Sequence, residues 1–192
     1  MKDQHSKIID NAARLMSEKG YKGTSLQEIA DRVGIHKSTL FHYFRNKEEL
    51  LLEVLRISIE EVTARLNRII NDESASPEDT LLKAMVNHIE MLAKYRDNVN
   101  VYHSDIRFLS EEKKRKYLNT RRYYEKCFLK IIDDLKRSDK RHFTNLDDHL
   151  VMFGILGMCN WVVKWYKPGG PYSPEEIAGV FNQMIMKGSE FR

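Results

Sequence analysis

Apolar residues recur three and four positions apart along almost the whole chain, and no run convincingly shows the two-residue alternation of a half-buried strand. This periodicity predicts an all-α protein. The predicted helices span residues 3–18, 25–34, 37–44, 47–70 and 77–95, short pieces within 98–108, and then 110–137, 146–166 and the segment from 173 onward.

Local signals mark the ends of these helices. Residues 25–28, Ser-Leu-Gln-Glu, have the form of a capping box, and Gly20 and Gly34 stand where a helix end favours a left-handed residue. The polar stretch 71–77 is the best linker. The run 168–171, Pro-Gly-Gly-Pro, cannot be helical because its prolines lack an N–H donor and its glycines are flexible.

The composition is that of a globular protein. Of the 192 residues, 42% are hydrophobic and 31% charged, which argues against disordered, collagen-like and membrane proteins. The longest apolar stretch, 150–166, contains Asn160 and Lys164 and is shorter than the roughly 20 residues of a membrane span, so a buried helix is expected. Cys127 and Cys159 belong to no metal-binding motif. Without an export signal, we expect a cytoplasmic protein that lacks disulfides, metals and cofactors.

The spacing within residues 26–44 is that of a helix-turn-helix. Ala30 is small where two helices would cross closely, and Gly34 allows the sharp turn between them. The alternative is an ordinary helical hairpin that turns at a glycine. Phe41 and Phe44 are expected in the core. The outward side chains of the second helix are donors and small polar groups suited to phosphates and base edges, namely Lys37, Ser38, Thr39, His42 and Tyr43.

Residues 20–30, Gly34 and 38–50 together resemble the TetR (tetracycline repressor) family of bacterial regulators. The resemblance implies a helix-turn-helix DNA-binding domain at residues 1–50 and a ligand-binding and dimerisation domain at residues 51–192. It also implies a homodimer that binds palindromic double-stranded operator DNA. The dimer would leave the DNA when a small-molecule effector enters the ligand-binding domain.

Carried over residue by residue, the resemblance implies that Thr24 and Ser25 hold a phosphate at a helix N-terminus and that Lys47 holds another. His36 stands where the family more often has a small capping residue, so capping, phosphate contact and simple exposure all stay open. The predicted DNA-binding residues are Thr24, Ser25, Lys37, Ser38, Thr39, His42, Tyr43 and Lys47.

The predicted helix at 150–166 is apolar on almost every side, so other helices, a pocket or a second subunit must cover it. Gly154 and Gly157 permit close helix approach. Together with the last helix, this segment could form a self-complementary dimer surface. An intramolecular core helix is the alternative.

Residues 157–178 are similar to the C-terminal segment of TetR regulators associated with acyl-CoA degradation. Residues 107–142 carry 13 basic against six acidic side chains, and a cationic rim would suit the phosphates of coenzyme A. A solvated basic helix face is the other interpretation, and tryptophans one turn apart are also compatible with simple packing. The predicted effector residues are Arg107, Arg121, Arg122, Trp161 and Trp165.

Catalytic motifs are missing from the sequence, so no enzyme is expected. Asp147, Asp148 and His149 are adjacent and would point in different directions on a helix, which favours capping over a metal or acid/base site. The second hypothesis for the whole chain is a structural nucleoid or partner-binding helical protein. Its DNA binding would be only weakly sequence-selective and would not respond to any small molecule.

Overall fold

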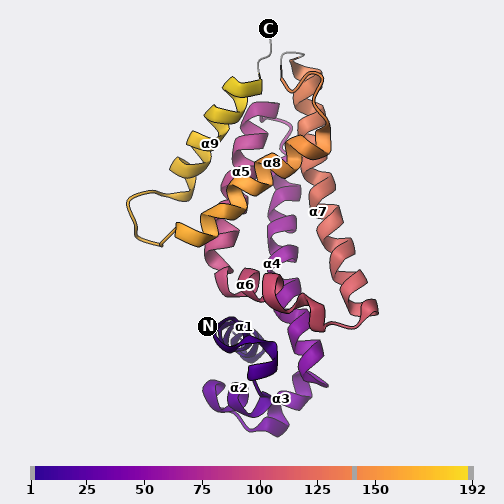
Figure 1. Ribbon diagram of the computed structural model, residues 1–192, viewed down its shortest axis with the longest axis vertical. Coiled ribbons are helices and arrows are strands. Elements are labelled where there is room, and N and C mark those ends of the chain that lie inside the picture. Colours follow the sequence, from indigo (N-terminus) through magenta and orange to yellow (C-terminus); the bar gives the residue numbers. More distant parts are fainter. Residues whose placement is uncertain (1–2, 140–141, 190–192) are drawn as a thin grey trace. The chain divides into compact units, whose positions relative to one another are not determined.

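The computed structural model describes residues 3–139 and 142–189. Within these ranges the chain forms α-helices and one 3-10 helix, η1, without strands, which confirms the all-α prediction (Figure 1). The elements in chain order are α1 (Gln4–Gly23), α2 (Leu26–Val33), α3 (Lys37–Tyr43), α4 (Lys47–Ile70), α5 (Pro77–Lys94), α6 (Arg96–Asp105), η1 (Ile106–Phe108), α7 (Glu111–Ser138), α8 (Asp148–Trp165) and α9 (Pro174–Ser189).

Capping chemistry sets the boundaries of α2. The Ser25 hydroxyl oxygen accepts a hydrogen bond from the Glu28 backbone N–H at 3.1 Å, and Gly34 ends the helix with φ of 77°. Gly20 also has a positive φ, 73°, but α1 resumes after this break and continues to Gly23. The predicted end of the first helix at residue 18 is therefore one turn too early.

The chain forms two compact units. The first comprises residues 1–60 and 95–120, and the second comprises residues 61–94 and 121–192. Helix α4 begins in the first unit and ends in the second. The division into domains at residue 50 is a functional one and stays a prediction.

Helices α1, α2 and α3, the first turns of α4, and α6 share the core of the first unit. Its fully buried side chains include Ile8, Met16, Ile29, Leu40, Leu50 and Val101. In the second unit, α5 packs against α8 and α9, and its buried side chains include Leu81, Met85, Phe128, Ile132 and Cys159. None of the helices in the described ranges has the length and hydropathy needed to cross a bilayer.

Candidate nucleic-acid interface and effector region

Helix α3 presents a polar face outside the core of the first unit. Leu40 is fully buried and holds the helix against its neighbours, whereas Thr39 is half-buried. The remaining predicted contact residues of this helix, Lys37, Ser38, His42 and Tyr43, are exposed. Their hydroxyl, ammonium and imidazole groups are therefore accessible to phosphates and base edges, as the sequence predicted.

The structure corrects the expected burial of Phe41 and answers whether the His36 side chain caps α3. Phe41 is 45% exposed and does not belong to the core, unlike Phe44, which is buried as predicted. The reason is helical geometry, because Phe41 stands four residues after the exposed Lys37 and so shares its side of α3, with the Lys37 Nζ 6.0 Å from the ring centroid. His36 occupies the N-cap position of α3 but makes no capping hydrogen bond through its side chain.

The neighbouring Thr24 and Ser25 have different environments. Thr24 is buried, and its hydroxyl donates to the Gly20 carbonyl oxygen at 3.0 Å, so its side chain closes the end of α1. This placement argues against the predicted phosphate contact from Thr24. Ser25 is exposed, and its hydroxyl oxygen accepts from the Glu28 backbone N–H, which leaves the hydroxyl hydrogen available to a phosphate.

Lys47 points at the end of α1. Its Nζ donates to the carbonyl oxygens of Tyr21 and Thr24 at 2.8 and 2.9 Å and lies 4.2 Å from the centroid of the Tyr21 ring. Burial lowers the pKa of this amine. Lys47 therefore fixes α4 to the C-terminal carbonyls of α1, and its predicted phosphate contact would have to share the ammonium with that role.

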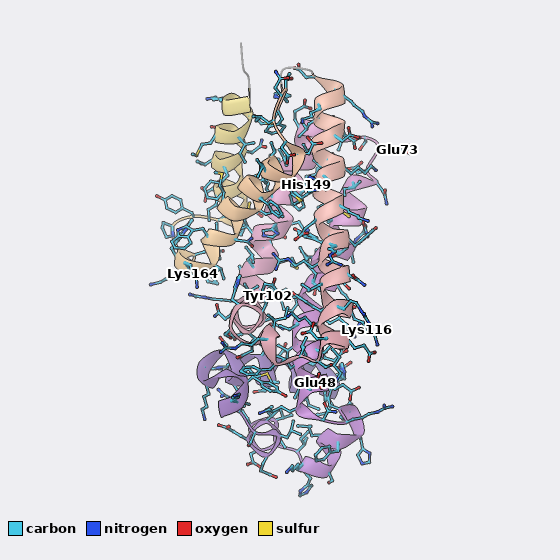
Figure 2. All side chains as sticks on the ribbon, turned by 45° about the vertical axis from the view of Figure 1, so that its right-hand side comes forward. Glu48, Glu73, Tyr102, Lys116, His149 and Lys164 are labelled. Atoms are coloured by element: carbon cyan, nitrogen blue, oxygen red, sulfur yellow. The ribbon has the colours of Figure 1, made fainter. Side chains whose placement is uncertain are left out.

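Two acidic residues that the sequence did not single out contact the predicted DNA-binding domain, residues 1–50, which we call the head. Both contacts connect the head to residues 95–120 of the same unit. Asp105, only 3% exposed, accepts from the Tyr21 backbone N–H at 3.0 Å, the amide that the break at Gly20 leaves without a helical partner. Glu48 accepts from the Ser110 backbone N–H at 2.7 Å and pairs with Lys113 at 2.9 Å (Figure 2). These contacts lower the pKa of Glu48 to about 2.

We expect Asp105→Ala to release the Tyr21 amide, because the substitution removes the carboxylate that accepts its hydrogen bond. Hydrogen exchange of that amide should become about tenfold faster, since a hydrogen bond to a charged group contributes at least 1.5 kcal/mol. Asp97→Ala, on the same helix, is the matched control and should leave the exchange rate unchanged. Unchanged protection of Tyr21 in the Asp105 variant would contradict the role assigned to this carboxylate.

A buried polar cluster lies in the second unit. His88 of α5 contacts the Tyr124 hydroxyl of α7 at 2.6 Å through Nδ1 and the Asn160 amide oxygen of α8 at 3.1 Å through Nε2. Burial lowers the pKa of His88 to about 4, so the imidazole is neutral near pH 7. Since the amide oxygen only accepts, Nε2 carries the proton and Nδ1 accepts from Tyr124. The cluster fixes three helices to one another.

The five predicted effector residues are divided between the two units. Arg107 belongs to the first unit, where its guanidinium lies 5.1 Å from the centroid of the Phe108 ring. Arg121 pairs with Glu125 of its own helix at 3.2 Å, and Arg122 is exposed. Trp161 is 66% exposed and Trp165 is also exposed. The tryptophans therefore lie on the surface of α8 rather than inside a tunnel of this chain.

Helices α8 and α9 carry an apolar surface, which we call the α8–α9 face. Its exposed members are Leu150, Phe153, Trp161, Val180 and Met184, with Leu150 71% exposed. Gly154 and Gly157 are also exposed, and a Cβ placed at either meets nothing within 4 Å. The opposite side of α8, including Met152, Ile155 and Cys159, is buried. Helices of the same chain thus cover α8 on one side.

The acidic run before α8 acts as a cap, as the sequence predicted. The Asp147 carboxylate accepts from the backbone N–H groups of His149 and Leu150, both at 3.0 Å. Asp148 pairs instead with Lys136 of α7. The described residues contain no group of side chains arranged to hold a metal ion.

Comparisons with known proteins agree with this geometry. The model for the tetR family of bacterial regulatory proteins matches residues 8–54, and the model for the tetracyclin repressor-like C-terminal domain matches residues 74–189. The transcriptional repressor KstR2 of Mycolicibacterium smegmatis is 28% identical over 187 residues, which cover 96% of this chain and 90% of that protein.

Two solved structures extend the similarity to the fold. The TetR-family regulator PfmR of Thermus thermophilus superposes with a TM-score of 0.83 at 30% identity, covering 96% of this chain and 99% of that one. AibR, solved in complex with isovaleryl coenzyme A and operator DNA, has a TM-score of 0.81 at 25% identity, with 96% and 98% covered.

Proposed function

Since the chain belongs to the TetR family of DNA-binding transcriptional repressors, we propose that it binds a palindromic operator as a homodimer in the cytoplasm and releases it on binding an acyl coenzyme A. Family membership makes the protein a transcriptional regulator and not an enzyme, as expected.

The observation that carries the DNA-binding assignment is the exposed polar face of α3, following a turn at Gly34. In this proposal Ser38, Thr39, His42 and Tyr43 enter the major groove, and Lys37 and Ser25 contact phosphates at its edge. Lys47 and Thr24 support the head from within.

The α8–α9 face supports the homodimer. Large apolar side chains rarely remain exposed together on one surface, and a second copy would cover them through a self-complementary four-helix contact. Two heads on one operator then read two half-sites related by the same two-fold axis, which a single short helix cannot do.

The complex of AibR with isovaleryl coenzyme A and operator DNA supports the effector class. Release requires the acyl-CoA to prefer the conformation that has left the operator. A thousandfold drop in operator affinity corresponds to a preference of about 4 kcal/mol. A ligand with equal affinity for both conformations would leave repression unchanged.

We expect a long-chain or polycyclic acyl-CoA to release the operator at about 100 µM, roughly ten times a 10 µM dissociation constant. A gel-shift titration compares the thioester with free coenzyme A and with the free acid. Each of the latter should release DNA less well, because coenzyme A lacks the apolar tail and the free acid lacks the phosphates.

Failure of every chain length and ring type in this titration would remove the acyl-CoA assignment. Footprinting distinguishes this proposal from the second hypothesis, a ligand-independent structural DNA-binding protein. A defined palindrome that loses protection with ligand supports a switch, whereas diffuse protection unaffected by any metabolite supports the structural protein.

A further inference from the structure

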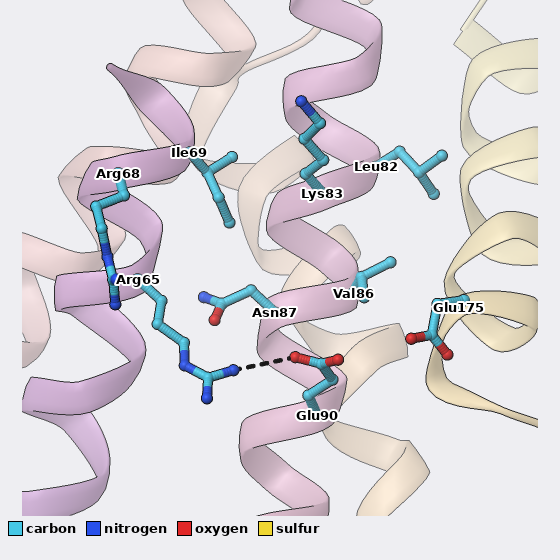
Figure 3. A pocket seen from close by; sticks show the side chains of 9 residues that line it. All are labelled: Arg65, Arg68, Ile69, Leu82, Lys83, Val86, Asn87, Glu90 and Glu175. Carbon is cyan, nitrogen blue, oxygen red and sulfur yellow. Dashed lines mark hydrogen bonds and ion pairs between the residues drawn. The ribbon is translucent and has the colours of Figure 1, made fainter. Parts of the chain in front are cut away.

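A groove of about 720 Å³ lies within the second unit, lined by side chains of α4, α5 and α9 (Figure 3). Pockets of this size hold small molecules of a few tens of atoms. The residues of this lining that matter below are Arg65, Arg68, Ile69, Val86, Asn87 and Glu90. None of the predicted effector residues belongs to this groove.

Three cations and two carboxylates line the groove. Arg65 pairs with Glu90 at 3.2 Å, and Lys83 pairs with Asp72 at 3.0 Å. Arg68 lies one turn from Arg65 on α4 and makes no ion pair with the described residues. Its exposed guanidinium can therefore donate hydrogen bonds to a phosphate without first breaking an ion pair within the protein.

The Asn87 amide is a second feature of the groove, and it requires a hydrogen-bond donor from a ligand. Its side-chain nitrogen donates to the Val62 carbonyl oxygen at 3.1 Å, so a flipped amide would bring two oxygens together. The amide oxygen has no hydrogen-bond partner, although the residue is only 4% exposed. Figure 3 shows this amide between α4 and α5, close to Arg65. A buried acceptor of this kind favours a ligand that brings an N–H donor.

We propose that this groove binds the phosphopantetheine arm of the acyl-CoA effector, an inference that rests on the proposed function. The arm combines the three features that the groove requires. A phosphate meets Arg68 with Arg65 beside it, an amide N–H donates to the Asn87 oxygen, and the branched dimethyl carbon packs on Ile69 and Val86. The phosphates thus bind between α4 and α5 rather than on the basic surface of α7.

Calorimetric titration of the full-length protein with coenzyme A tests this placement. Arg68→Ala should weaken binding about tenfold, because one charge-assisted phosphate contact is lost, and Arg68→Lys should retain most of the affinity. The matched control is Arg122→Ala, which removes an exposed arginine of the α7 surface and should bind like the parent. Since Arg68 is exposed and forms no ion pair within the described part of the chain, its substitution is not expected to impair folding.

A second variant tests the groove independently of charge. Val86→Trp fills the space beside Asn87 and should reduce the binding both of coenzyme A and of pantetheine, which has no phosphate, whereas Arg68→Ala should leave pantetheine binding unchanged. If Arg122→Ala weakens coenzyme A binding and Arg68→Ala does not, the groove assignment is overturned while the acyl-CoA repressor stands. If the parent binds neither coenzyme A nor any acyl-CoA, the effector assignment itself fails, and the groove assignment with it.

Discussion

Replacing Tyr43 by alanine is expected to weaken operator binding by about 100-fold or more, since each good base contact contributes roughly 1–3 kcal/mol and a dimer loses two of them. Tyr43 is 41% exposed at the end of α3, and its hydroxyl is free of intramolecular partners among the described residues. Helix α3 should remain in place because the neighbouring Leu40 and Phe44 are buried and are not changed by the substitution. A gel shift on the operator, with thermal unfolding in parallel, measures both effects.

Three companion variants and one control variant separate base reading from phosphate contact. Tyr43→Phe keeps the ring and removes only the hydroxyl, so it tests the contribution of that hydroxyl alone. Thr39→Ala, like Tyr43→Ala, should abolish tight binding. Lys37→Ala should weaken binding to all sequences alike and lower the salt dependence by about one counterion per head. Tyr172→Ala changes an exposed tyrosine outside the head and should bind as the parent does. Equal operator affinity of Tyr43→Ala and the parent would contradict the assignment.

Lys47, the other lysine predicted to contact a phosphate, is not suited to the same test. Its ammonium binds the Tyr21 and Thr24 carbonyl oxygens, so Lys47→Ala would also loosen the end of α1. A lower operator affinity of that variant could then report a displaced head rather than a lost phosphate contact. Lys37 is the better probe because it forms no ion pair with the described residues.

The fold was predictable because its signals are local. The 3.6-residue periodicity, the Ser25 cap and the left-handed Gly34 each act within one or two turns, and α4 begins and ends where the pattern predicts. The extension of α1 beyond Gly20 was not predictable, since its stabilising acceptor is Asp105, 84 residues away. Sequence spacing carries no information on such a distant partner.

The candidate site was predictable only in part, for the same reason. An exposed donor on α3 follows from helical periodicity, whereas the burial of Thr24 depends on how the end of α1 packs. The basic run at 107–142 predicted a phosphate rim, yet Arg121 pairs with Glu125 of its own helix. Arg68 and the buried Asn87 oxygen gave no signal in the sequence, since neither residue lies in a motif.

We expect Phe153→Glu to convert the proposed homodimer into a monomer. Phe153 is 55% exposed on the α8–α9 face, so a carboxylate there is solvated in the single chain but would be buried without a partner in the dimer. Central aromatic residues of an interface often contribute 2 kcal/mol or more each, and two-fold symmetry places two of them in the contact. Self-association should therefore weaken by on the order of 100-fold or more.

Sedimentation at micromolar concentration measures the loss of the dimer, and a gel shift on the palindrome measures its consequence. Operator affinity should fall together with dimerisation, although α3 is unchanged, because one head contacts only half of the site. Tyr123→Glu places the same charge on an exposed aromatic position of α7 and should remain dimeric. A parent protein that is monomeric both alone and on DNA would overturn the dimer, whereas a Phe153 variant that stays dimeric would move the contact away from the α8–α9 face.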